Sequence, residues 1–262
     1  MPELVSDPAD PRLADFRDLT SADRRPDRPG GRGLVIAEGV PVVRRLLASP
    51  YPVRAVLGVP GRLAALAGDL AAVDAPVYQA SADVMARTVG FQLNRGVLAA
   101  ADRAPQPSTG PLLAGARRVL ALEGVNDHEN LGALFRNAAG LGVDAVLLGP
   151  RCADPLYRRS VRVSMGHVLR VRFTRAPLSA LREAGLTVLA LTPRAPAVPL
   201  STVDPTVPRA ALLVGAEGPG LTAAALTIAD LHIRIPMAAG VDSLNVATAA
   251  AIALHHLSTS PP

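Results

Sequence analysis

Three short tracts in the second half of the chain constrain its fold most strongly, because each places small polar residues directly after an apolar run. Residues 123–139 read E-G-V-N-D-H-E-N-L-G-A-L-F-R-N-A-A, residues 212–221 read L-L-V-G-A-E-G-P-G-L, and residues 235–249 read I-P-M-A-A-G-V-D-S-L-N-V-A-T-A. Polar residues at the carboxyl end of a buried strand are where an open α/β sheet binds ligands. The sequence therefore predicts three loops at one edge of a sheet, which together can build one pocket.

The apolar patterns along the chain predict strands that alternate with helices. In the first half, the pattern predicts strands at residues 34–37, 53–59, 77–79 and 97–101 and helices at 40–48, 62–70 and 82–89. In the second half, it predicts strands at 119–122, 145–148, 168–173, 187–191, 211–214 and 231–235 and helices at 131–141, 155–165, 178–184, 223–228 and 244–256. Because the later strands are continuous apolar runs, we expect an α/β fold with a mostly parallel sheet and helices on both faces.

Composition divides the chain into four segments. Residues 1–32 are rich in Pro, Asp, Arg and Gly, and we expect a flexible N-terminal arm with one short helix around 13–19. Residues 33–103 form a small α/β unit, and residues 104–116 are rich in Pro, Gly and Ser, which is typical of a linker. Residues 117–262 form the second and larger α/β domain.

The basic residues exclude several kinds of chemistry, because all 27 are arginine and the chain has no lysine. A P-loop lysine, a Schiff-base lysine and a pyridoxal phosphate anchor are therefore absent. Arginine binds phosphate in a bidentate fork, and a net charge of +5 favours a polyanionic partner. Since aromatic residues are only 3% and tryptophan is absent, we expect phosphate contacts and the shape of the RNA to dominate any nucleic-acid binding.

Cysteine, histidine and hydropathy exclude further classes. Cys152 is the only cysteine, which rules out an intramolecular disulfide and a multi-cysteine metal site. The five histidines have no metal-ligand spacing, and no apolar run is long enough for a transmembrane helix. The first ten residues do not resemble a signal peptide. We therefore expect a cytoplasmic protein that binds neither a metal nor a membrane.

Each of the three tracts also has a purely structural interpretation. Asn130 stands where a helix N-cap belongs, Ser243 fits the N-cap of the last helix, and the glycines around Glu217 fit a Gly-Pro turn. A helical arginine such as Arg136 is usually a solvated surface residue. However, the neighbours of Arg136 are apolar, which suggests that it leaves a packed surface to face a cleft. Capping also does not explain why Ser243, Asn245 and Thr248 all lie in the first turns of an otherwise apolar helix.

The chain resembles the SpoU (TrmH-like) branch of the SPOUT RNA methyltransferases in these residues. The matching patterns are N-x-x-x-N-x-G-x-x-x-R at residues 126–136, G-x-E-G-x-G at 215–220, and I-P-M with S-L-N-V-A between 235 and 247. They occur in the family's order, and the resemblance covers residues 117–256. More weakly, A-E-G-V at 37–40 and G-V-L-A at 96–99 resemble the family's substrate-binding domain, which is similar to ribosomal protein L30e.

The resemblance implies a SPOUT methyltransferase domain with a deep C-terminal trefoil knot, preceded by an L30e-like domain, and a homodimer formed through the C-terminal domain. It implies transfer of a methyl group from S-adenosylmethionine to a ribose 2′-hydroxyl of RNA. The residues implied to bind the cofactor are Leu191, Thr192, Gly215, Ile235, Met237, Ser243 and Leu244. The residues implied to form the catalytic face are Asn130, Arg136, Glu217, Ser243 and Asn245.

Arginine keeps its proton in proteins, so we expect Arg136 to bind either the phosphate beside the target ribose or the developing alkoxide, and not to act as a base. We expect structured RNA as the substrate, ribosomal RNA in preference to transfer RNA. The arginines expected to bind its phosphates are Arg44, Arg45, Arg158, Arg159 and Arg162.

Two other functions compete with this one. A non-catalytic RNA-binding or ribosome-assembly factor with the same fold predicts broken motifs, whereas Arg136, Glu217 and Asn245 are all present. A nucleotide-binding oxidoreductase is disfavoured because no G-x-G-x-x-G fingerprint opens a helix. The target nucleotide stays open at this point, as does the choice between a housekeeping and an antibiotic-resistance role.

Overall fold

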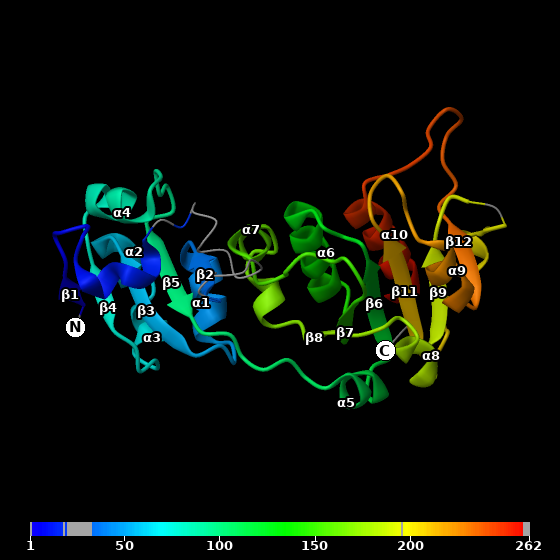
Figure 1. Cartoon of the computed structure of the whole chain (residues 1–262), viewed down its shortest axis with the longest axis horizontal. Coiled ribbons are helices and arrows are strands. Elements are labelled where there is room, and N and C mark those ends of the chain that lie inside the picture. The colour runs from blue at the N-terminus through cyan, green and yellow to red at the C-terminus, as the bar shows by residue number, and fades with distance from the viewer. Residues whose placement is uncertain (1, 18, 20–32, 195, 259–262) are drawn as a thin grey trace. The chain divides into compact units, whose positions relative to one another are not determined.

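The computed structural model describes residues 2–17, 19, 33–194 and 196–258 (Figure 1). These residues form two compact units. The first contains the chain up to Pro105 together with Asp154–Arg170, and the second contains Gln106–Ala153 and the chain from Val171 onward. Residues 154–170 were expected in the second domain, but they pack into the first unit, so the chain passes between the units three times.

The first unit is built on a mixed five-stranded sheet with the strand order β1-β4-β3-β5-β2. Strands β1, β4 and β3 are parallel to one another, whereas β5 runs antiparallel to both β3 and β2. The bounds are β1 (Glu3–Leu4), β2 (Val35–Glu38), β3 (Val53–Gly58), β4 (Val77–Gln79) and β5 (Val97–Ala101).

Short helices complete the first unit. They are η1 (Pro11–Phe16), α1 (Val40–Leu47), α2 (Pro60–Ala64), α3 (Ala67–Leu70), α4 (Ala82–Val89), α7 (Arg158–Val163) and η3 (His167–Leu169). The single helix expected at residues 62–70 is two, α2 and α3, because the chain leaves helical geometry at Leu66, whose side chain is fully buried.

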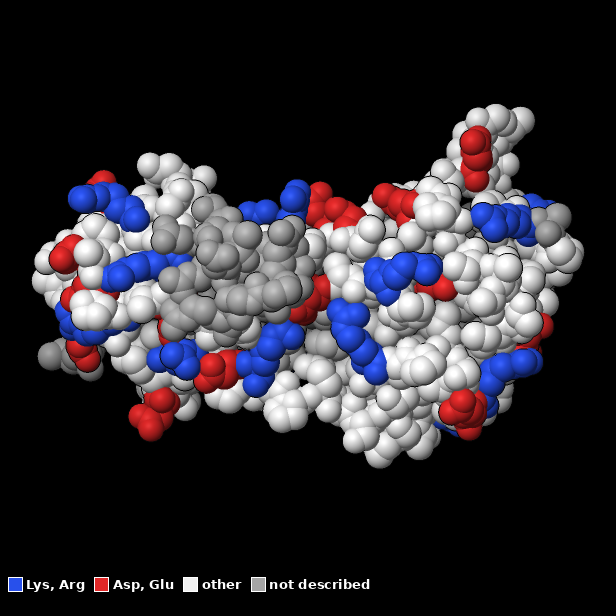
Figure 2. All heavy atoms as spheres, in the orientation of Figure 1, with Lys and Arg blue, Asp and Glu red and all other residues white. Residues whose placement is uncertain are grey.

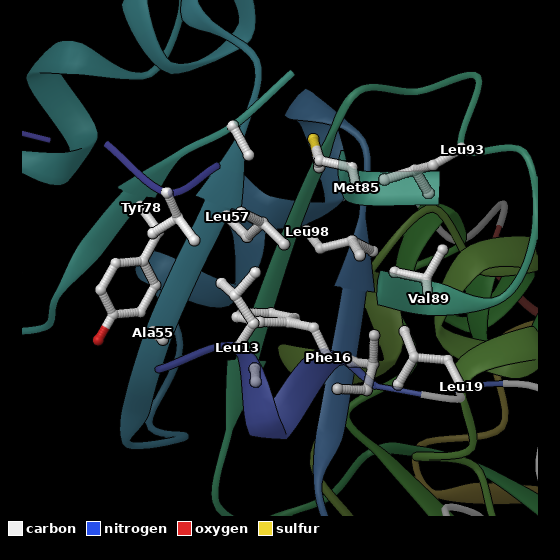
Figure 3. Close-up of a cluster of buried hydrophobic side chains, with 14 of the residues drawn as sticks. Leu13, Phe16, Leu19, Ala55, Leu57, Tyr78, Met85, Val89, Leu93 and Leu98 are labelled. Carbon is white, nitrogen blue, oxygen red and sulfur yellow. The ribbon is translucent and has the colours of Figure 1, made fainter. Parts of the chain in front are cut away.

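The N-terminal residues belong to the core of the first unit, in contrast to the expected flexible arm. Leu13 and Phe16, which η1 places on one face, are fully buried against Leu57 and Leu98 (Figure 3). Strand β1 extends the sheet beside β4. Burial of two large apolar side chains outweighs the polar composition around them. Residues 20–32 of the expected arm lie outside the described residues.

The second unit is built on a seven-stranded sheet with the order β10-β12-β9-β11-β6-β7-β8. Every pair in it is parallel, which confirms the expected sheet. The bounds are β6 (Arg118–Glu123), β7 (Ala145–Leu148), β8 (Phe173–Arg175), β9 (Thr187–Leu191), β10 (Val198–Pro199), β11 (Ala210–Gly215) and β12 (Leu231–Arg234).

Helices cover both faces of this sheet. Alternate strand residues point to opposite sides, and because the strands are mostly apolar, both sides have to be buried. Val119 and Ala121 of β6 share a core with α5 (Thr109–Ala114), α8 (Ala180–Glu183) and α9 (Ala223–Ile228). On the other face, α10 (Val246–Ser258) packs against β11, and α6 (His128–Gly140) packs against α10. A short turn, η4 (Leu200–Thr202), follows β10.

Two segments differ from the sequence expectation for reasons of burial. The expected linker at 104–116 contains α5, because Leu112 and Leu113 enter the core of the second unit. The strand expected at 168–173 is divided into η3 and β8, since Val168 and Leu169 are buried in the first unit before the chain returns to the second. Among the described residues, no helix is long and apolar enough to cross a membrane.

Candidate active site

A cavity of about 500 Å³ lies in the second unit at the carboxyl ends of β9, β11 and β12. Its lining includes all seven residues that the resemblance assigned to cofactor binding, namely Leu191, Thr192, Gly215, Ile235, Met237, Ser243 and Leu244. The cavity is large enough for a nucleoside. Its apolar walls can contact the base, and the backbone donors and acceptors at the strand ends can form hydrogen bonds with it. The predicted set is thus brought together by the fold.

The loop after β11 forms one wall of this cavity, and there is a steric reason for the glycine at position 215, where the loop begins. A Cβ atom on Gly215 would lie 2.4 Å from both the carbonyl carbon of Gly220 and the backbone nitrogen of Leu221. Ala216 and Gly220 pair as an isolated antiparallel bridge, with the Gly220 N–H donating to the Ala216 carbonyl over 3.0 Å. The loop therefore folds back on the end of its own strand and presents Glu217 at its tip.

Asn245 joins the three tracts. Its Nδ2 donates to Oδ1 of Asn130 and to Oε1 of Glu217, each over 2.7 Å. Its Oδ1 accepts from the backbone nitrogens of Ala247 and Thr248 over 3.0 and 3.2 Å, which caps the start of α10. The Asn245 amide nitrogen thus binds the side chains of the other two tracts, and the amide oxygen caps α10.

Asp127, and not Asn130, is the N-cap of α6. The Asp127 carboxylate accepts from the backbone nitrogens of Glu129 and Asn130 over 2.9 and 2.8 Å. The structural interpretation of Asn130 as a cap is therefore wrong, because an aspartate three residues earlier meets the same need. Its side chain is left available for Asn245.

Two residues that contact the loop after β11 were not among the predicted site residues. Glu123, the last residue of β6, accepts hydrogen bonds from the backbone and the hydroxyl of Thr222. The Nη2 of Arg194 donates to the carbonyl of Pro219 over 2.8 Å. Glu123 could have been found from the sequence, because it is an acidic residue at the end of a buried apolar strand. No local pattern indicated Arg194.

Arg136 lies outside the lining of the cavity. It is exposed on α6, between the buried residues Phe135 and Ala138. Of the five residues expected on the catalytic face, Glu217, Ser243 and Asn245 line the cavity, and Asn130 reaches it through Asn245. Among the described residues, no group of three or more His, Cys, Asp or Glu side chains could hold a metal ion.

The arginines expected to bind RNA differ in their surroundings. Arg44 pairs with Asp69 over 2.9 Å, and the Nη1 of Arg45 donates to the Met165 carbonyl over 2.8 Å. Arg158 donates to the Glu38 carboxylate over 3.2 Å and stacks 4.5 Å above the ring of Phe91. These three have partners within the first unit.

Burial lowers the pKa of Arg158, although a guanidinium remains charged near neutral pH. Arg159 is exposed and Arg162 is half-buried. Among the described residues on the face drawn in Figure 2, basic side chains are interspersed with acidic ones.

The chain matches proteins of known family over nearly its whole length. The model of the SpoU rRNA Methylase family matches residues 117–255. An uncharacterized tRNA/rRNA methyltransferase of Mycobacterium tuberculosis is 62% identical over 98% of this chain and 91% of its own length. A 23S rRNA (guanosine-2′-O-)-methyltransferase from a Burkholderia species is 32% identical over 81% of this chain and 91% of its own.

Solved structures share the fold of both units. A crystal structure of an rRNA methyltransferase from Sinorhizobium meliloti has a TM-score of 0.80 at 26% identity, and it covers 97% of this chain and 96% of its own. The AdoMet-bound crystal structure of an rRNA methyltransferase from the same organism has a TM-score of 0.82 at 24% identity, with 97% of both chains covered.

Proposed function

The chain belongs to the SpoU rRNA methylase family of S-adenosylmethionine-dependent RNA 2′-O-ribose methyltransferases, and on that premise we propose that it methylates a ribose 2′-hydroxyl of a structured ribosomal RNA. The observation that carries this proposal is Asn245, whose two donor contacts join the Asn130 and Glu217 tracts at the edge of the cavity. A ribosomal substrate is supported by the 32% identical relative whose name gives 23S rRNA as its target.

The cavity residues fit S-adenosylmethionine, which supplies the methyl group as an electrophile when bound. Leu191, Ile235 and Leu244 offer apolar contacts for the adenine, and the backbone at Thr192, Met237 and Gly215 offers hydrogen bonds to the nucleoside. Ser243 and Asn245 also line the cavity, and Asn245 donates a hydrogen bond to Glu217 in the loop after β11. These assignments use the lining of the cavity and the chemistry of its donors.

The catalytic residues act by positioning and by charge. Asn245 holds the Glu217 carboxylate and the Asn130 amide in one arrangement, so their geometry does not have to form during the reaction. Arg136 cannot release its proton at neutral pH, and its role is to bind the phosphate beside the target ribose or the alkoxide that develops there. Its exposure on α6 suits contact with a large polyanion.

RNA binds through arginines of both units, in particular Arg44, Arg45, Arg158, Arg159 and Arg162, with the first unit acting as the L30e-like substrate-binding domain. The functional molecule is a homodimer formed through the second unit, and Ile252 on α10, which is 41% exposed, is an apolar residue available to such an interface. A cytoplasmic location follows from the substrate. The trefoil knot stays a prediction.

The decisive experiment follows labelled methyl groups from S-adenosylmethionine into total RNA with the purified wild-type protein and Arg136→Ala. We expect the variant to keep its calorimetric affinity for the cofactor and to lose most turnover, about a hundredfold, the effect of removing one charge-assisted transition-state contact. Lost cofactor binding in the variant would contradict this division of roles. Saturable RNA binding without methyl transfer by the wild type would instead identify a non-catalytic RNA-binding factor.

A further inference from the structure

Glu123 is a buried carboxylate to which the proposed reaction assigns no role. It is the last residue of β6, its residue exposure is 4%, and it stands opposite Gly215 in the register of β6 and β11. A carboxylate removed from water is costly unless its oxygens receive hydrogen bonds. The hydrogen-bond partners of the Glu123 carboxylate therefore indicate its role at the end of β6.

Both oxygens of Glu123 accept hydrogen bonds from a single residue, Thr222. Oε2 accepts from the Thr222 backbone nitrogen over 2.9 Å, and Oε1 accepts from the Thr222 hydroxyl over 2.8 Å. The same hydroxyl accepts from the Ala225 nitrogen over 3.1 Å and so caps α9. The guanidinium of Arg151 lies 3.9 Å from Oε1, which is too long for a hydrogen bond.

Glu123 thereby holds both ends of the loop that walls the cavity. Its backbone pairs with Gly215, where the loop begins, and its side chain binds Thr222, where the loop ends. Between these two points stand Ala216, Glu217, Gly218 and Gly220, all of which line the cavity. The tip of the same loop carries the Glu217 carboxylate that receives the Asn245 hydrogen bond.

We propose that Glu123 is a positioning residue of the methyltransferase, which acts through Thr222 to fix the cofactor-facing loop and the Glu217 carboxylate. This rests on the proposed function of the cavity as the S-adenosylmethionine site. Glu123 contacts neither the cavity nor the RNA substrate in this role. Its effect is exerted on the shape of the wall between Gly215 and Thr222.

A purely structural role is the competing interpretation. Asp144, which is exposed, provides a control for the loss of two hydrogen bonds at an end of β6. Its Oδ2 accepts from the backbone nitrogens of Arg117 and Arg118, each over 2.8 Å, at the start of β6. Each acid therefore accepts two hydrogen bonds at an end of the same strand. Only Glu123 is at the end that carries the cavity, so the two acids should differ in their effect on cofactor binding.

The test compares Glu123→Gln and Asp144→Asn by thermal unfolding and by calorimetric titration with S-adenosylmethionine. Glutamine keeps the shape of the side chain, but it is neutral and has only one acceptor oxygen. Both contacts with Thr222 therefore lose their charge assistance, and one of them is lost or reversed in direction. We expect both variants to unfold at lower temperature. We expect the Kd for S-adenosylmethionine to rise about tenfold in Glu123→Gln and to stay within about twofold of wild type in Asp144→Asn.

A second pair of variants keeps the test informative if Glu123→Gln does not fold. Thr222→Ser retains the hydroxyl and should bind the cofactor like wild type, whereas Thr222→Val loses it and should raise the Kd. Ser81→Ala, which removes the cap of α4 in the first unit, controls for the loss of a helix cap.

Unchanged cofactor affinity in Glu123→Gln, or in Thr222→Val if the former does not fold, overturns the positioning role. An equal rise in Kd for the matching control, Asp144→Asn or Ser81→Ala, does so as well. Failure of the wild-type protein itself to bind S-adenosylmethionine would instead refute the proposed function of the cavity.

Discussion

Asn245→Ser separates the two tasks of Asn245, because serine is a good N-cap but has no amide donors. The Ser hydroxyl can accept from the first turn of α10, so the helix stays capped. The hydrogen bonds to Asn130 and Glu217, both 2.7 Å in the structure, are removed. The variant therefore tests the contacts that join the three tracts while α10 stays intact.

The magnitude follows from the kinds of hydrogen bond that are lost. A neutral amide contact contributes about 0.5–1.5 kcal/mol, and a contact to a carboxylate about 1.5–3 kcal/mol. Glu217 and Asn245 are exposed, so the lower end of each range applies and the loss is about 2 kcal/mol. If these contacts preorganise the catalytic face, kcat/KM for RNA falls roughly thirtyfold.

The assay is methyl transfer from labelled S-adenosylmethionine to RNA, with thermal unfolding of the same samples. We expect the Tm of Asn245→Ser to stay close to that of wild type, and Asn245→Ala, which also lacks the cap, to unfold about 3 °C lower. Asn245→Asp keeps a cap but sets a second carboxylate against Glu217, so its activity should fall below that of the serine variant. Activity of Asn245→Ser within twofold of wild type would show that these contacts do not preorganise the catalytic face.

Two further predictions concern the loop after β11 and acid stability. Gly215→Ala should abolish cofactor binding in calorimetry and lower the Tm, because the new Cβ would lie 2.4 Å from the backbone of Gly220 and Leu221. The control for added bulk is Gly218→Ala, since nothing lies within 4 Å of a Cβ at that position. The φ of +81° at Gly218 makes the alanine there mildly strained, so a small fall in Tm is expected in the control as well. The backbone hydrogen bond from Val188 holds the pKa of Asp230 below its ordinary value of 3.8, and the contact with Arg182 adds to this. A depressed folded pKa gives stability that is present above the unfolded pKa and is lost as pH falls through the folded one. The Tm difference between wild type and Asp230→Asn should therefore narrow below about pH 4, and a difference that does not change with pH would count against this role.

Much of the fold was predictable because strand and helix periodicities are local. The bounds predicted for residues 77–79, 82–89, 97–101, 145–148, 187–191 and 223–228 agree with β4, α4, β5, β7, β9 and α9. The predicted bounds were wrong where the burial of a residue depended on residues that are distant in the sequence. The apolar residues Val168 and Leu169 suggested a strand, and only their packing in the first unit made them a short turn of helix.

The candidate site divides in the same way. The strand ends predicted a pocket at one edge of the sheet, since parallel strands bring their carboxyl ends together. The resemblance to the SpoU family implied which residues bind the cofactor, and these residues line the cavity. The roles of Glu123 and Arg194 did not follow, because each contacts a loop that is distant in sequence. Arg136 was assigned by its motif, and the structure adds that it lies on the exposed side of α6, outside the cavity lining.

Residue type and short-range spacing were sufficient to predict the alternation of strands and helices, the three polar loops and the chemistry excluded by the absence of lysine. Which polar side chain caps a helix and which one serves the site became clear from long-range contacts alone. Asp127 caps α6, and Asn130 is left to meet Asn245, 115 residues away. Such a choice depends on donors and acceptors that folding brings together, and no local pattern contains it.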